Sequence, residues 1–177
     1  MKTEAKFENV FQEQLENLFD AEKQIVEALP KMAVQATSEE LAGAFQECLD
    51  QTKEQLTRLQ IIFGRIGMEP SRKCEAIEAL LREGEKSIAA FEKSAALDFI
   101  LVSVASQVEH FQMATYSAAC ALAESLGQQD AFDLLQTTLH EETESDDDLS
   151  EIAEAILSGD VDRPPPDTVI AEEERSR

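Results

Sequence analysis

Apolar residues recur every three or four positions along most of the chain, a spacing that places them on one face of an α-helix. The repeat is clear over 7–36, 41–67, 95–126 and 131–157. Glycine and proline, which interrupt helices, number only six and five among 177 residues. We therefore expect four long helices, the first of which should bend or loosen at Pro30.

The lengths of the connections predict how these helices are arranged. Few residues separate the first helix from the second, or the third from the fourth, so each pair should form an antiparallel hairpin. The segment between the hairpins, about 68–94, is long enough to run the length of a bundle, and its weak helical pattern is interrupted by Gly84. Two hairpins joined by a long crossover predict an all-α, ferritin-like four-helix bundle with a short helix in the crossover.

The composition predicts where the helical bundle ends and which partners its net charge disfavours. Residues 1–159 carry the helical pattern and are assigned to a single bundle, whereas 160–177 are polar, acidic and rich in proline, which predicts a flexible tail. The whole chain has 15 basic and 37 acidic residues, a net charge of −22. This charge repels phosphate backbones and anionic bilayers, so we expect neither nucleic acid nor a membrane as a partner.

The cysteines and the first residues indicate a compartment. Three cysteines without paired spacing favour reduced thiols over a disulfide framework. The opening "MKTEAKFENV" lacks the apolar run of a signal peptide. Both features predict a cytoplasmic protein.

Acidic residues interrupt the apolar faces of three predicted helices. Glu22 lies on the apolar face of the first helix, Glu109 on that of the third, and Glu142 on that of the fourth, where Asp146 continues the face. Several ionised carboxylates in one core are costly and repel one another unless a cation neutralises them. Carboxylates that project inward from bundle helices are typical ligands of di-metal sites. The pattern therefore predicts a metal site at these four residues.

Two other interpretations of these residues stay open. Each carboxylate could lie at the edge of its apolar face, where it would reach solvent or pair with Lys23 or Arg58. His110, about 100° around the helix from Glu109, could be a ligand, a partner that orients a carboxylate, or a packing residue. The remaining candidates for ligands or for partners of ligands are Gln112, Cys48, Thr52, Gln55 and Tyr116.

The chain resembles the YciE/YciF-type stress-associated family of the ferritin-like superfamily. The similar segments, in order from Leu15 to Ala155, are "LFDAEKQIVEALPKMA", "LAGAFQECLDQTKEQLTRLQIIFGRIGMEP", "KCEAIEALLREGE", "ALDFILVSVASQVEHFQMATY" and "LLQTTLHEETESDDDLSEIA". The resemblance implies a four-helix bundle, a homodimer and a metal site between the helices. The family's carboxylate positions correspond here to Glu22, Glu109, Glu142 and Asp146.

The chain also departs from that family's pattern. Family members often have histidine where this chain has Cys48, glutamate where it has Gln112, and histidine or glutamine at the position of Gln55. The Glu-x-x-His motif of many ferritin-like di-iron proteins is missing, because glutamine and serine stand three residues after Glu109 and Glu142. These departures leave the occupancy and nuclearity of the metal site open.

Two functions are therefore compatible with the sequence. The first is a cytoplasmic, stress-associated protein that binds one or two metal ions and could support oxidase-type chemistry. An oxygen-rich site with little histidine favours iron or manganese, although other divalent metals also suit it. The second is a metal-free helical scaffold or interaction protein with a degenerate metal site.

Overall fold

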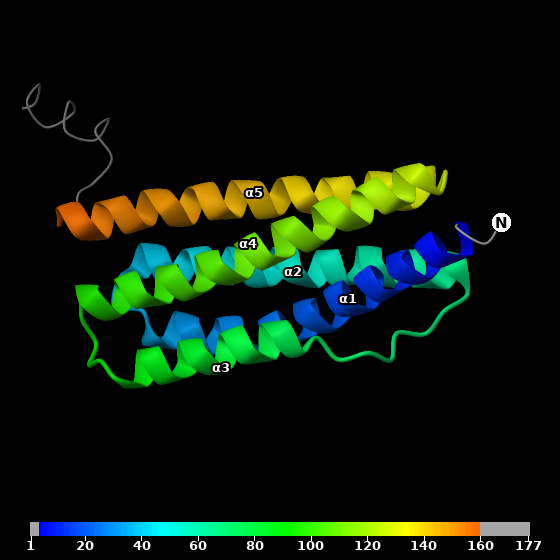
Figure 1. Cartoon of the computed structure of the whole chain (residues 1–177). Helices are drawn as coiled ribbons and strands as arrows, with labels where there is room; N and C mark the ends of the chain where they lie inside the picture. The colour runs from blue at the N-terminus through cyan, green and yellow to red at the C-terminus, as the bar shows by residue number, and fades with distance from the viewer. Residues whose placement is uncertain (1–3, 160–177) are drawn as a thin grey trace, which may run out of the picture.

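The computed structural model describes residues 4–159, which form five α-helices and no strand (Figure 1). The four long helices that the sequence predicts are α1 (Glu4–Gln35), α2 (Glu39–Ile66), α4 (Ala95–Ser125) and α5 (Gln129–Ser158). The predicted crossover contains α3 (Glu75–Ala89). The predicted acidic tail, 160–177, lies outside the described residues. Within 4–159, no helix combines the length and apolar character needed to cross a bilayer.

Neither predicted interruption breaks a helix. The first helix continues through Pro30 to its end at Gln35, and α3 runs through Gly84. The expectation that Gly84 interrupts the crossover helix is therefore wrong. Gly84 is buried within α3, where its backbone lies against α4.

The α1–α2 connection is held in place by a buried aspartate on α4. The carboxylate of Asp98 accepts hydrogen bonds from the backbone N–H groups of Thr37 and Ser38 and from the Thr37 hydroxyl. Ser38 in turn caps α2 by accepting a bond from the N–H of Leu41, and Gly67 ends α2 in the left-handed conformation. One hairpin is thereby joined to the start of the other.

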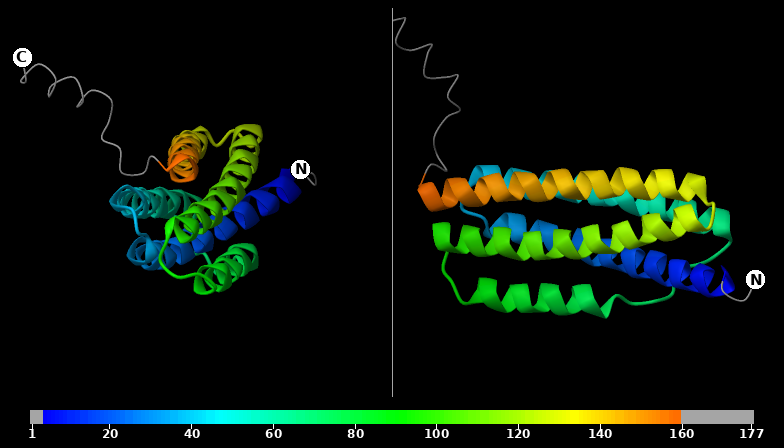
Figure 2. Two further views of the ribbon diagram at one scale, coloured as in Figure 1. Left: turned by 90° about the vertical axis from the view of Figure 1, so that its left-hand side faces the viewer. Right: turned by 45° about the horizontal axis from the view of Figure 1, so that its top comes forward.

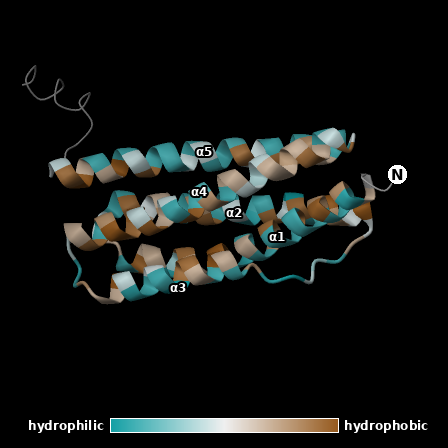
Figure 3. Cartoon of the chain, in the orientation of Figure 1, coloured by the Kyte–Doolittle hydropathy of each residue, from teal (hydrophilic) through white to brown (hydrophobic). Residues whose placement is uncertain are grey.

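Each helix of one hairpin packs against the other hairpin. In addition to the contacts within the hairpins, α1 contacts α4 and α2 contacts α5 (Figure 2). The shorter α3 lies outside this group, against α4 and α1. Apolar positions of the helices face one another and polar positions face outward (Figure 3). Since α4 is covered by α1, α3 and α5, it has the most buried residues of the five helices.

The interior contains two apolar clusters with polar residues between them. One cluster includes Ile25, Phe45, Leu101 and Leu149, and the other includes Leu15, Leu18, Leu59, Ile62, Tyr116 and Leu135. On every long helix, buried polar side chains lie between the two clusters. We call this set the polar layer; it comprises Glu22, Thr52, Gln55, Glu109, Gln112, Thr138, Glu142 and Ser145.

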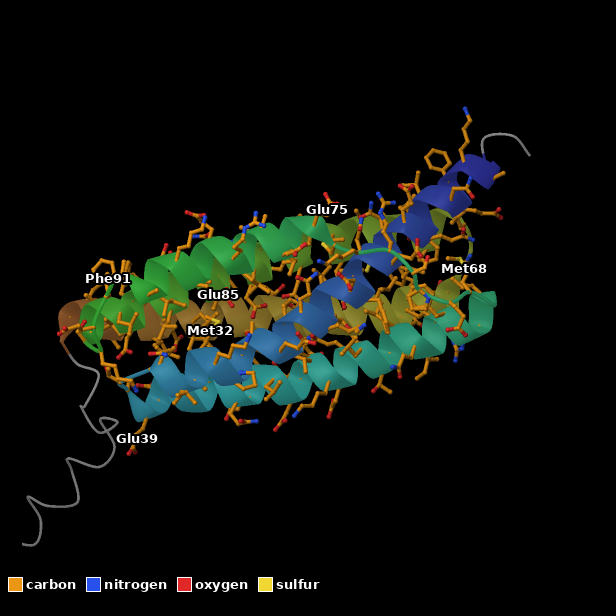
Figure 4. All side chains as sticks on the ribbon, turned by 90° about the horizontal axis from the view of Figure 1, so that it is seen from below. Met32, Glu39, Met68, Glu75, Glu85 and Phe91 are labelled. Atoms are coloured by element: carbon orange, nitrogen blue, oxygen red, sulfur yellow. The ribbon has the colours of Figure 1, made fainter. Side chains whose placement is uncertain are left out.

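The C-terminal half of α3 borders both a groove and a close contact with α4. A groove of about 310 Å³ runs between α1 and α3, and its lining includes Met32, Leu81, Glu85 and Phe91 (Figure 4). Beside this groove, α3 approaches α4 closely at Gly84. A Cβ atom at this position would lie 2.6 Å from Cγ1 of Val104, which is too short for a carbon–carbon contact.

We expect Gly84→Ala to destabilise the protein by about 1–3 kcal/mol, because the new methyl group overpacks the α3–α4 contact. In a Val104→Ala background the nearest atom is the Cβ at 3.5 Å, an ordinary contact. There the same substitution should be stabilising, by up to about 1 kcal/mol, because alanine favours helix more than glycine does. Urea denaturation of the four proteins measures both effects, and the same sign in both backgrounds would contradict the steric explanation.

Candidate functional site

Three glutamates from three helices lie in the polar layer with almost no access to solvent. The exposed fractions are 0% for Glu22 of α1, 9% for Glu109 of α4 and 3% for Glu142 of α5. None of them lies at the edge of its apolar face, so that alternative is wrong. Arg58 does not pair with them either, because its guanidinium group forms two bonds, of 2.5 and 2.6 Å, to Glu141.

Both carboxylate oxygens of Glu22 have hydrogen-bond donors from α4. The hydroxyl of Tyr116 donates to Oε1 at 2.6 Å, and Nε2 of Gln112 donates to Oε2 at 2.8 Å. Both donors are themselves buried. Burial nevertheless raises the pKa of Glu22 to about 8, because desolvation outweighs the stabilisation that these bonds give to the ionised form. Each carboxylate oxygen of Glu22 therefore has a hydrogen-bond donor on α4.

Glu109 and Glu142 form the second part of the cluster. Their side chains are hydrogen-bonded to each other, and Oε1 of Glu109 also accepts a bond of 3.1 Å from the Ser145 hydroxyl. Burial raises the pKa of Glu109, and burial together with the charge of Glu109 raises the pKa of Glu142 well above its usual range. Since a bond between two carboxyl groups needs a proton, the metal-free pair holds at least one proton.

The α2 side of the layer contributes neutral groups. The thiol of Cys48 lies 3.1 Å from the Ser145 hydroxyl, and burial raises its pKa to about 11, so it is a thiol rather than a thiolate. The hydroxyl of Thr52 donates to the backbone carbonyl of Cys48 at 2.7 Å. Nε2 of Gln55 lies 3.4 Å from Glu141. None of these side chains supplies a negative charge to the cluster.

His110 and Asp146 lie beside the cluster rather than in it. The imidazole of His110 is 65% exposed, and its Nδ1 lies 2.7 Å from the carbonyl oxygen of Ser106. The same nitrogen is 3.5 Å from Oδ1 of Asp146, whose side chain is mostly buried. The negative charge of Asp146 contributes to the raised pKa of Glu109. The structure thus brings Glu22, Glu109 and Glu142 together, with Asp146 at the margin and His110 outside.

Some buried acceptors of this region have no hydrogen-bond donor. Within the described residues these atoms are Oε1 of Gln55, Oε2 of Glu142 and Oδ1 of Asp146. An unpaired buried acceptor is costly, and either a proton on a neighbouring carboxyl group or a bound cation would satisfy it. In the same part of the chain, 4–159, no three His, Cys, Asp or Glu side chains are already placed to hold a metal ion.

Two residues of the polar layer, Ser145 and Thr138, and one ion pair beside it were not predicted from the sequence. Ser145, which donates to Glu109, follows Glu142 by three residues and therefore shares its helix face. This spacing could have been used to predict from the sequence that Ser145 lies beside the glutamates. The pairing of Arg58 with Glu141 joins α2 to α5, and it could not be found from positions on a single helix.

Comparisons with known proteins agree on one family. A family model described as "Domain of unknown function (DUF892)" matches residues 6–161. Protein YciF of Escherichia coli (strain K12) is 37% identical over 155 residues, which are 86% of this chain and 92% of that protein. The crystal structure of the E. coli stress protein YciF has a TM-score of 0.83 and 34% identity over 86% of this chain and 97% of that one. A structure described as YcfI, from Rhodopseudomonas palustris, has a TM-score of 0.79 and 34% identity over 81% and 92%.

The raised pKa values predict an unusual dependence of stability on pH. In the folded protein the pKa of Glu22 is about 8, against 4.5 for an ordinary glutamate, so between these values the folded state binds more protons than the unfolded state. Stability of the metal-free protein should therefore fall as pH rises through this window, by up to about 1.4 kcal/mol per pH unit for one such group. Urea denaturation in the presence of a chelator, between about pH 5 and 8, measures this slope.

The Glu22→Gln variant should show a smaller slope, because it removes one of the titrating groups. Glu144→Gln is the matched control, since it removes the same charge from a 64% exposed side chain of α5 and should leave the slope unchanged. Equal slopes in the wild type and Glu22→Gln would contradict the assignment of a raised pKa to Glu22.

Proposed function

Because this chain belongs to the family described as Domain of unknown function (DUF892), we propose that it shares the stress-associated role named for the E. coli protein YciF. We further propose that its buried glutamate cluster binds a divalent metal ion. The family match supports the first part of the proposal, and the arrangement of the cluster supports the second.

The proposed fold is the ferritin-like four-helix bundle. Two features support it: the antiparallel pairs α1–α2 and α4–α5, and the long crossover with α3 that joins them. In bundles of this kind, metal ligands project inward from facing helices. Glu22, Glu109 and Glu142 have that disposition. A homodimer and a cytoplasmic location, both expected from the sequence, complete this proposal.

One observation carries the metal-binding proposal. Two buried side chains of the layer, Glu142 and Gln55, each have one oxygen without a donor. Glu142 also forms a pair with Glu109, and these two carboxyl groups repel each other when both are ionised. A divalent cation would provide the missing partner and remove the repulsion. The donors are oxygens, which suit iron or manganese in the divalent state, as well as magnesium or calcium.

The residues around the cluster would prepare it for a cation. Ser145 orients one oxygen of Glu109, and the bonds from Tyr116 and Gln112 fix Glu22 against α4. The apolar clusters on either side separate the layer from bulk solvent at the ends of the bundle. A bound iron or manganese ion would supply redox or Lewis-acid chemistry in this buried layer.

A specific observation also favours a second candidate, the metal-free scaffold. In the part of the chain that the structure describes, no three acidic, histidine or cysteine side chains are already gathered as a metal site. On α2, the side chains that face the layer are Cys48, Thr52 and Gln55, none of which is charged at neutral pH. In this candidate the carboxyl groups keep their protons, and the layer serves only to hold the helices in place.

Elemental analysis of untagged protein after anaerobic loading with Fe²⁺ or Mn²⁺ tests the proposal. We expect one or two ions per chain in the wild type and a large loss in Glu109→Gln, which keeps the shape of the side chain but removes its charge. Bound metal should also raise the stability, by about 2.7 kcal/mol when the free ion is at one hundred times its Kd.

The scaffold candidate predicts different results from the same measurements. It predicts no bound metal and no change of melting temperature on addition of metal. It also predicts that Glu22→Ala and Glu109→Ala act only through lost packing and hydrogen bonds, so the change in stability that each causes should be the same with and without added metal. Stoichiometric metal that depends on Glu109 would exclude this candidate.

A further inference from the structure

The buried glutamates are not equivalent in their hydrogen bonding. Each oxygen of Glu22 accepts one buried hydrogen bond, from Tyr116 at 2.6 Å and from Gln112 at 2.8 Å. If Glu22 turned to bind a cation, the buried hydroxyl and amide would lose their acceptor, and each unpaired group would be costly. The geometry therefore opposes the use of Glu22 as a ligand.

The acceptors that lack a donor come from two other helices, α2 and α5. Glu142 and Gln55, from α5 and α2, are 3% and 2% exposed, and each has one oxygen without a partner. Gln55 and Glu109 both lie close enough to Glu142 to affect the pKa of its carboxyl group, so side chains of three helices meet there. Glu109 retains an oxygen that does not accept the bond from Ser145.

Charge balance limits the number of ions that the layer can hold. Its three glutamates carry at most three negative charges, and the nearby Arg58 is paired with Glu141. One dication is neutralised by Glu109 and Glu142. A second would also need the charges of Glu22, whose bonds to Tyr116 and Gln112 hold it against α4, and of Asp146, which lies at the margin beside His110. A buried net charge is strongly unfavourable, so the layer is suited to a single ion.

We propose that this chain binds one divalent cation, through carboxylate oxygens of Glu109 and Glu142 and the amide oxygen of Gln55, and that Glu22 is not a ligand. This inference rests on the proposed metal-binding function and specifies its ligands and its stoichiometry. Water molecules would complete the coordination, as is usual for Mg²⁺ and for similar hard cations held by one or two carboxylates. Carboxylate, amide-carbonyl and water oxygens are ligands that suit Mn²⁺ and Mg²⁺.

This assignment gives Glu22 a different role. Its bonds to Tyr116 and Gln112 tie α1 to α4. The resemblance to the YciE/YciF-type family places Glu22 among the carboxylates of a metal site. In this chain, the amide of Gln112 and the hydroxyl of Tyr116 instead make it part of the helix packing.

Manganese binding in matched variants tests the inference. Chelator-treated wild type, Glu22→Gln, Glu142→Gln and Glu144→Gln are titrated with Mn²⁺, and bound manganese per chain is measured by elemental analysis. We expect one ion per chain, with similar affinity, in the wild type, in Glu22→Gln and in the exposed control Glu144→Gln. Glu142→Gln should weaken binding by about tenfold or more, the loss seen even for partners of metal ligands.

Two further measurements keep the test independent of folding defects. Gln55→Leu removes the third donor without changing a charge and should also weaken Mn²⁺ binding by about tenfold. Far-ultraviolet circular dichroism confirms that each variant is helical. The electron paramagnetic resonance spectrum of the loaded wild type should be that of an isolated Mn²⁺ ion rather than of an exchange-coupled pair.

The outcomes separate this inference from the function on which it rests. Two ions per chain, a coupled spectrum, or an equal loss of binding in Glu22→Gln and Glu142→Gln would overturn the single-ion assignment and leave metal binding intact. No bound manganese in the folded wild type would overturn both.

Discussion

The burial of three glutamates in one layer is the constraint on which the rest of this structure depends. A carboxylate removed from water needs a proton, hydrogen-bond donors or a cation. The structure meets this need differently at each position. Glu22 has two donors from α4, Glu109 has the Ser145 hydroxyl and a shared bond with Glu142, and Glu142 keeps one oxygen without a donor. The three glutamates therefore differ in their hydrogen-bond partners, and Glu142 is the one with an oxygen that lacks a donor.

The charged residues at the margin of the layer do not supply it with a cation. Arg58 follows Gln55 by three residues on α2, but its guanidinium group is bound to both oxygens of Glu141 and to Thr138. This pairing neutralises Glu141, whose charge would otherwise raise the pKa of Glu22 further. On the opposite margin, Asp146 raises the pKa of Glu109. The cluster therefore has no internal cation to balance it.

The sequence predicted the helices and the inward carboxylates because both depend on periodicity along single helices. Glu22, Glu109 and Glu142 were found in this way, and the four long helices have nearly the predicted bounds. Contacts between helices were not predictable, because they depend on relative rotation and register. The anchoring of the α1–α2 connection by Asp98 is one such contact, and the bond from Ser145 to Glu109 is another. The close approach of α3 to α4 at Gly84 could not be predicted from the sequence either, so this glycine was interpreted as a helix breaker.

The polar layer also determines how the helices are aligned along the bundle. A slip of α5 by one turn, about 5.4 Å, would separate Glu142 from Glu109 and move it toward one of the apolar clusters, near Leu149 or Leu135. Both carboxyl groups would then lose their partners in a nonpolar environment, at a cost of several kcal/mol. This penalty acts whether a proton or a cation lies between the two side chains. The carboxylates therefore contribute to the specificity of the fold even without metal, and a chain that had lost its metal would still be constrained to keep them.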